Sequence, residues 1–321
     1  MQSAGHLPPP SDLLAPRATE SSWRPARLKL FDPRARDFGR PDKDAAVASL
    51  SEHRNTSQGP LVHRQRLLTR VTHWAWAVSL FFLLLTGFQI FNAHPALYWG
   101  QESGFEYNNA FLALSGRDTD DGLRGVTWVL GREWDTTGLL GASGGQVRGF
   151  PSWATIPSHH DLATGRVIHF FFAWLLSGTL LLWLVASLLN GHLRELIPTP
   201  SDLRALPGDL LNHARLRMHR TRKYNVVQKL TYAAVLFVLL PLMVLTGLCM
   251  SPSFNAAVPW LLDVFGGRQS ARTLHFLGMV LLVLFFLVHI LMILLAGPLN
   301  EMRSIVTGWY RIDPDGDARD R

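Results

Sequence analysis

Four long apolar stretches constrain the fold of this chain more than any other feature of its sequence. None of them contains Asp or Glu, and Lys229 is their only Lys or Arg. Each is long enough to cross a hydrocarbon core about 30 Å thick at about 1.5 Å per helical residue. Because lipid offers the backbone no hydrogen-bond partners, such stretches cross a membrane as helices. We therefore expect an all-α fold, an integral membrane four-helix bundle, with helices at about 71–91, 167–189, 226–248 and 273–296.

The distribution of basic residues predicts the orientation of these helices. Of the 31 Lys and Arg, 24 lie in residues 1–70, 190–229 and 297–321, and 7 lie in the alternating segments. This positive-inside pattern indicates a multi-pass protein of a bacterial cytoplasmic (inner) membrane with both termini cytoplasmic. The net charge of +7 follows the membrane topology, so membrane lipid is an expected partner and nucleic acid is not.

The segments outside the apolar stretches differ in kind. Residues 1–60 are rich in Pro, Arg, Asp and Ser, which predicts a disordered cytoplasmic arm, and no apolar run in them is typical of a secretory signal peptide. Residues 92–166 combine aromatic residues with many glycines, which predicts an ordered periplasmic loop cap, with anchoring at the membrane interface as the alternative. Its eight acidic residues against five arginines make it mildly acidic, and a docking face for a periplasmic partner is a hypothesis. We expect a membrane domain over 61–310 and a cytoplasmic tail over 311–321.

The apolar stretches repeat in pairs. Leu-Thr-Gly occurs at 85–87 and again at 245–247, and Arg-x-x-His-Phe occurs at 166–170 and again at 272–276. Duplication of a helical hairpin explains this repetition better than chance. Aligning the repeats places Ala233 opposite His73, so the third stretch lacks that histidine, whereas the fourth has an additional one, His289.

Four of the 13 histidines, His73, His169, His275 and His289, lie inside the apolar stretches. An ionisable residue in a membrane is costly and is by default a candidate functional residue, although a histidine bonded to a neighbouring helix is the alternative for each one alone. The 14 residues from His275 to His289 advance about 21 Å and turn about 1400°, so both lie on one helix face. Matching by depth pairs His169 with His275 on the outer side and His73 with His289 on the inner side.

Two imidazoles from facing helices suit the axial positions of haem better than zinc or a non-haem iron, which need further ligands. Cys249 is the only cysteine, which excludes thiolate iron–sulfur clusters and the two-thiol attachment of a c-type haem. The sequence therefore predicts two haem groups that are bound without a covalent link to the chain. Iron with two axial histidines has no open position, which favours electron transfer over catalysis at the metal.

An arginine precedes three of these histidines by three residues. Residues at this spacing share a helix face, so each arginine would lie one turn nearer the interface, where haem propionates would emerge. Interfacial snorkelling is the alternative. Glycines in the helices would leave room for flat macrocycles or allow close helix packing. The arginines are Arg70, Arg166 and Arg272, and the glycines are Gly87, Gly178, Gly247 and Gly278.

These residues resemble the bacterial cytochrome b561 and nickel-hydrogenase cytochrome b family, which includes membrane subunits of formate dehydrogenases and thiosulfate reductases. The resemblance covers about 61–310, and its most specific part is one histidine in each of the first two helices and two, 14 residues apart, in the last. It implies that His73, His169, His275 and His289 are axial ligands of two b haems. It also implies electron exchange between quinone and a redox partner such as a molybdoenzyme, a hydrogenase or a cytochrome.

We expect a respiratory-chain subunit that transfers electrons between the quinone pool and that partner. One alternative is a stand-alone oxidoreductase that oxidises a small reductant such as superoxide and reduces quinone. Another is a haem-free anchor or transporter whose histidines relay protons. Candidate quinone-binding residues are Asn190, His192, Arg194 and Lys229 at the inner edge, and Asn92 and His94 at the outer edge.

Overall fold

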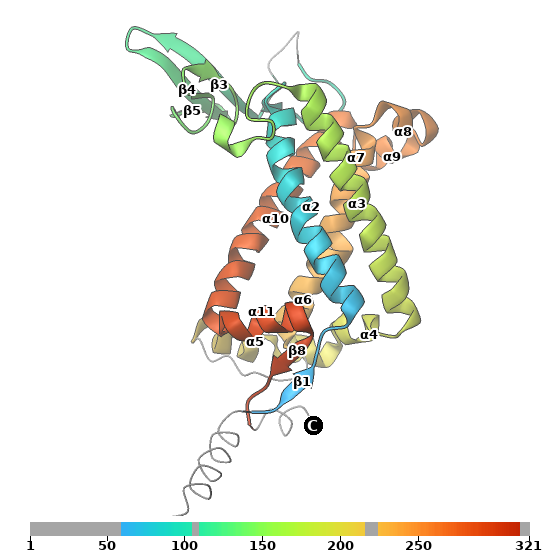
Figure 1. Cartoon of the computed structure of the whole chain (residues 1–321). Coiled ribbons are helices and arrows are strands. Elements are labelled where there is room, and N and C mark those ends of the chain that lie inside the picture. The colour runs from blue at the N-terminus through green and yellow to red at the C-terminus, as the bar shows by residue number, and fades with distance from the viewer. Residues whose placement is uncertain (1–58, 105–108, 216–223, 315–321) are drawn as a thin grey trace, which may run out of the picture. The chain divides into compact units, whose positions relative to one another are not determined.

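The computed structural model describes residues 59–104, 109–215 and 224–314 (Figure 1). Almost all of the predicted arm and most of the predicted tail therefore lie outside the described residues. The described residues contain four helices long and apolar enough to span a membrane: Leu67–Phe91, Leu162–Leu189, Val226–Cys249 and Arg268–Ala296. Many of their large apolar side chains face outward, such as Leu181 and Phe286. The predicted all-α membrane bundle is confirmed.

The first, second and fourth spans are the continuous helices α2 (Leu67–Phe91), α3 (Leu162–Leu189) and α10 (Arg268–Ala296). The third span consists of α6 (Val226–Ala234), one π-helical segment, η2 (Val235–Leu239), and α7 (Leu240–Cys249). Pro241 has no backbone N–H and cannot donate to the preceding turn, which explains the wider π-helical turn directly before it.

The four spans are arranged as two hairpins. Helix α2 packs along α3, and α7 packs against α10 (Figure 1). An apolar cluster at mid-height joins the hairpins: Leu176 of α3, Leu240 of α7 and Leu282 of α10 are buried together, and Trp76 and Leu80 of α2 pack against them. The two hairpins thus share one core between the two ends of the bundle.

One end of the bundle carries a folded cap, and we call this end the cap end (Figure 1). The sequence predicted an ordered cap but no strands, whereas the structure has a four-stranded antiparallel sheet in the order β2-β3-β4-β5. Strands β3 and β4 are joined by a tight turn at Asp120-Asp121. The cap elements are β2 (Ala96–Leu97), β3 (Leu112–Thr119), β4 (Gly122–Val129), β5 (Arg132–Asp135), β6 (Ala142–Ser143), β7 (Gln146–Val147), η1 (Ser152–Ala154), α8 (Pro252–Ala257) and α9 (Trp260–Val264).

The opposite end, which we call the base, brings the two ends of the described chain together. Strand β1 (Leu61–His63) pairs antiparallel with β8 (Trp309–Arg311), and Ile312 next to β8 is buried. Three helices complete the base: α4 (Leu193–Leu196), α5 (Pro200–Ala214) and α11 (Pro298–Thr307).

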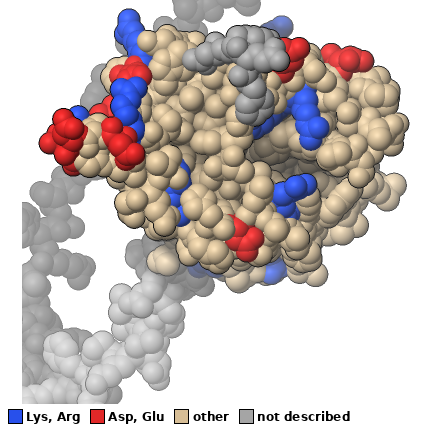
Figure 2. Space-filling view, turned by 90° about the horizontal axis from the view of Figure 1, so that it is seen from above, with Lys and Arg blue, Asp and Glu red and all other residues tan. Residues whose placement is uncertain are grey.

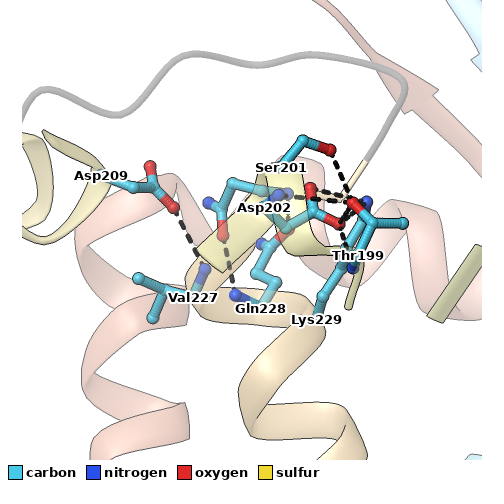
Figure 3. Close-up of polar contacts among 8 residues, drawn as sticks. Thr199, Ser201, Asp202, Asp209, Val227, Gln228 and Lys229 are labelled. Carbon is cyan, nitrogen blue, oxygen red and sulfur yellow. Dashed lines mark hydrogen bonds and ion pairs between the residues drawn. The ribbon is translucent and has the colours of Figure 1, made fainter. Parts of the chain in front are cut away.

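Two carboxylates of α5 fasten it to the start of the third span (Figure 3). Asp209 Oδ2 accepts from the Val227 backbone N–H at 3.1 Å, and Lys229 Nζ lies 3.0 Å from Asp202 Oδ2. The backbone N–H of Thr199 and then the Lys229 ammonium lower the pKa of Asp202 to about 2. Carboxylates at a helix N-terminus are favourable, and the pairing neutralises the one Lys of the apolar stretches.

We predict that Asp202→Asn lowers the thermal unfolding midpoint of the detergent-solubilised protein by about 2–4 °C at pH 7, the equivalent of about 1 kcal/mol. Because the pKa of Asp202 is depressed in the folded protein, its stabilisation is complete above the ordinary carboxyl pKa of about 4 and is lost as the pH falls toward about 2. The difference between variant and parent should therefore shrink in melts below pH 4.

Asp121→Asn is the matched control, because the ion pair between Asp121 and Arg124 is exposed to solvent and contributes little to stability. An equal loss of stability in the two variants would contradict the role of Asp202.

Candidate functional site

The four intramembrane histidines form two facing pairs. The ring centroids of His169 in α3 and His275 in α10 lie 6.5 Å apart, with 56° between the ring planes. Those of His73 in α2 and His289 in α10 lie 6.4 Å apart, with 52° between the planes. The structure thus brings together the two pairs that depth alone suggested. Leu282, in the apolar cluster, lies midway between the two histidines of α10.

A threonine holds the ring of His169 at the cap end. Thr86 Oγ1 donates to the Phe82 carbonyl oxygen at 2.6 Å and lies 3.0 Å from His169 Nδ1. A hydroxyl has one proton, so Thr86 accepts from the histidine, whose Nδ1 carries the hydrogen. Nε2 of His169 then keeps its lone pair and is the nitrogen available to a metal.

The second hairpin repeats this arrangement. Thr246 Oγ1 donates to the Leu242 carbonyl oxygen at 2.6 Å and lies 3.0 Å from His275 Nδ1. Thr86 and Thr246 are both fully buried. The repeated Leu-Thr-Gly motif was the signal in the sequence for these two threonine–histidine contacts, although the sequence alone did not predict them.

The glycines of that motif lie against the same rings. A Cβ atom on Gly87 would lie 3.6 Å from Cε1 of His169, and one on Gly247 would lie 3.5 Å from Cε1 of His275. The other two predicted glycines differ. A Cβ atom on Gly278 would approach Met243 Sδ to 2.7 Å, which indicates close packing of α10 on α7, and one on Gly178 would meet nothing within 4 Å.

The pair at the base has different surroundings. Nδ1 of His73 is buried and has no hydrogen-bond partner among the described residues. His289 stacks on Phe285, with 5.5 Å between centroids. The hydroxyl contact therefore belongs to the cap-end pair.

The three predicted arginines lie one turn from their histidines, with different contacts. Arg70 donates to the Val306 carbonyl oxygen of α11, and Arg272 donates to the His94 carbonyl oxygen. Arg166 is exposed, with its guanidinium 5.6 Å from the Phe170 ring centroid. Figure 2, a view onto the cap end, shows basic side chains around a hollow in this face.

The outer candidates for quinone binding are engaged in cap contacts. The side chain of Asn92 donates to the Phe150 carbonyl oxygen at 3.2 Å and accepts from the Phe150 N–H at 2.6 Å. The ring of His94 stacks on Tyr98, and burial, followed by the nearby charge of Arg272, lowers the pKa of His94. Asn92 therefore joins α2 to the cap.

The inner candidates are spread over the base. Lys229 is paired with Asp202, and Asn190 Oδ1 accepts from the His192 backbone N–H at 3.0 Å. His192 is buried, whereas Arg194 is exposed. Lys229 thus has a structural partner.

The donor set of each histidine pair fits haem iron. Two metal–nitrogen bonds of about 2 Å, with about 1.1 Å from each nitrogen to its ring centroid, give a separation of about 6.2 Å. The observed 6.4 and 6.5 Å match this separation. No group of three or more His, Cys, Asp or Glu that could hold a metal ion occurs in the described part of the chain.

We predict that Asn92→Ala loosens the cap without removing the histidine pairs, because it deletes both bonds to Phe150. Hydrogen exchange of residues around Phe150 should become faster, with helix content unchanged by circular dichroism. Asn92→Asp keeps the acceptor and loses the donor, so it should give an intermediate rate. An unchanged rate of hydrogen exchange in Asn92→Ala would show that the two hydrogen bonds between Asn92 and Phe150 do not stabilise the cap.

Comparison with known proteins identifies the family of this chain. The family model described as prokaryotic cytochrome b561 matches residues 64–308. A protein of Azospira oryzae named putative protein-methionine-sulfoxide reductase subunit YedZ1 is 27% identical over 230 residues, covering 70% of this chain and 87% of that protein. The chain belongs to the prokaryotic cytochrome b561 family and is a membrane haem b electron-transfer protein.

Proposed function

We propose that this chain is a di-haem cytochrome b that transfers electrons between quinone and a redox partner. This proposal rests on the two pairs of facing histidines, each of which includes one histidine of α10. His169 and His275 would hold one haem b at the cap end, and His73 and His289 would hold the other near the base. Haem iron with two axial histidines exchanges single electrons without an open coordination position.

The arginines beside the histidines support this assignment. Haem propionates are anionic, and a guanidinium one helical turn from an axial ligand binds such a group well. At the cap end Arg166 is exposed, and Arg272 lies between the His94 carbonyl oxygen and the Phe91 ring. Near the base, Arg70 would serve the second haem.

The spacing of the two sites supports electron transfer across the bilayer. The step of 14 positions from His275 to His289 corresponds to about 21 Å along α10, most of a hydrocarbon core about 30 Å thick. The buried apolar cluster around Leu176, Leu240 and Leu282 lies between the two sites. Electrons would thus pass between two separated centres in an apolar interior.

We propose that the cap end faces the periplasm and receives the redox partner. Most Lys and Arg of the sequence lie in residues 1–70, 190–229 and 297–321, and the described parts of these stretches form the base, which favours a cytoplasmic location for it in a bacterial inner membrane. The similar Azospira oryzae protein is named a subunit of a methionine-sulfoxide reductase, which supports a catalytic oxidoreductase as the partner. Quinone or quinol would exchange electrons with one of the two centres from within the membrane.

We predict that the purified protein contains two non-covalent haem b groups per chain, one for each histidine pair. His169→Ala and His275→Ala should each lose the cap-end haem, and His73→Ala and His289→Ala should each lose the other, because each variant removes one of two axial ligands. Haem content per chain, measured by the pyridine haemochrome spectrum, checks this.

His160→Ala is the control, since His160 is exposed at the cap and should leave both haems in place. Methionine substitutions, which keep a possible iron ligand, replace any alanine variant that does not fold. A colourless parent expressed with ample haem would contradict the proposal. Rapid reduction of the isolated parent by superoxide, without a partner, would favour the stand-alone oxidoreductase instead.

We predict opposite labelling for cysteines placed at the two ends. Cys249 is 1% exposed and gives a low background for a membrane-impermeant maleimide. Ser115 of β3 and Ser201 of α5 are exposed; Ser115→Cys should react on intact spheroplasts, whereas Ser201→Cys should react only after lysis. The reverse pattern would show that the cap faces the cytoplasm.

A further inference from the structure

The two histidine pairs differ in the hydrogen bonds to their rings. Both cap-end histidines contact a threonine hydroxyl through Nδ1, at 3.0 Å in each case. No such bond occurs at the other pair within the described residues, where Nδ1 of His73 is buried and unpaired. We propose that Thr86 and Thr246 are positioning residues that lower the midpoint potential of the cap-end haem. This inference rests on the proposed function.

The contact is more than the ordinary back-bonding of a threonine in a membrane helix. A threonine hydroxyl in an apolar helix is already satisfied by donating to the carbonyl four residues earlier. Thr86 and Thr246 both make that bond, at 2.6 Å, and each also accepts from a histidine on the neighbouring helix. The second contact is therefore not needed to satisfy the threonine hydroxyl and instead gives the histidine ring a hydrogen-bond acceptor.

The two contacts agree although their connections differ greatly. Thr86 and His169 are 83 residues apart in the sequence, with the strands of the cap between them, whereas Thr246 and His275 are 29 apart, with only α8 and α9 between them. Both hairpins nevertheless place the threonine in the first helix and the histidine in the second, with the same distances. The threonine–histidine unit is thus preserved in both halves of the duplicated fold.

The chemical consequence follows from the direction of the bond. A ring that donates its Nδ1–H to an acceptor becomes more electron-rich at Nε2 and is a more basic ligand. A more basic ligand stabilises ferric over ferrous iron and so lowers the reduction potential, one of the means by which a protein tunes haem. Both threonines are fully buried, where weak dielectric screening strengthens the bond.

The test is a potentiometric titration, followed by absorbance, of the two-haem protein and its Thr86→Val and Thr246→Val variants. Valine keeps the shape of threonine and removes the hydroxyl. Each variant should shift the ferric/ferrous equilibrium of the cap-end haem about tenfold toward ferrous, an increase of about 59 mV for a one-electron couple. The other haem should keep its potential.

Two further variants assign the effect. The same substitutions in a His73→Ala background, which should retain the cap-end haem alone, identify which titration component shifts. Thr86→Ser and Thr246→Ser keep the hydroxyl and should restore the parent potential. Restoration by serine separates loss of the hydroxyl from loss of packing.

Several outcomes would overturn the inference while leaving the proposed function intact. These are an unchanged cap-end potential in both valine variants, an equal shift of both haems, or loss of the cap-end haem from both variants, which would indicate a structural role. A parent without two haems would instead contradict the proposed function itself.

Discussion

The approach of α10 to helices of the other hairpin is the interaction on which the rest of this structure depends. His275 faces His169 of α3, and His289 faces His73 of α2, with nearly equal ring separations of 6.5 and 6.4 Å. Because a membrane forces each span to be helical, a spacing of 14 residues places both histidines on one face of α10. The apolar cluster of Leu176, Leu240 and Leu282 packs the two hairpins together between the two histidine pairs.

The duplicated hairpin gives the two centres different characters. At the cap end each hairpin contributes the same unit, a threonine on its first helix and a histidine on its second, so the site is nearly symmetric. The histidine pair near the base does not come from two copies of one unit. The third span carries Ala233 where the first carries His73, so His289 of α10 supplies the second ring. The polar groups around the imidazole rings therefore differ between the two histidine pairs, although each pair consists of two imidazoles.

Local properties of the sequence were sufficient for the spans and for the pairing of histidines by depth, because composition and helical periodicity determine both. The first span begins at Leu67 rather than near 71, and the third contains a π-helical segment before Pro241. The cap sheet was not predicted, since strand pairing depends on contacts between separate segments. The partner of Lys229 was not predicted, because Asp202 lies 27 residues away on a helix that folds back against it. The contacts of Thr86 and Thr246 with histidines were not predicted either, because they depend on which helix lies opposite.

A density map of the pigmented, purified protein in lipid tests the central claim most directly. Two flat macrocycles should be seen, one with its iron about 2 Å from imidazole nitrogens of His169 and His275, the other with its iron bound in the same way by His73 and His289. Density for a single haem, or for a haem bound between histidines of different depth, would contradict the arrangement of two haems at two depths along α10.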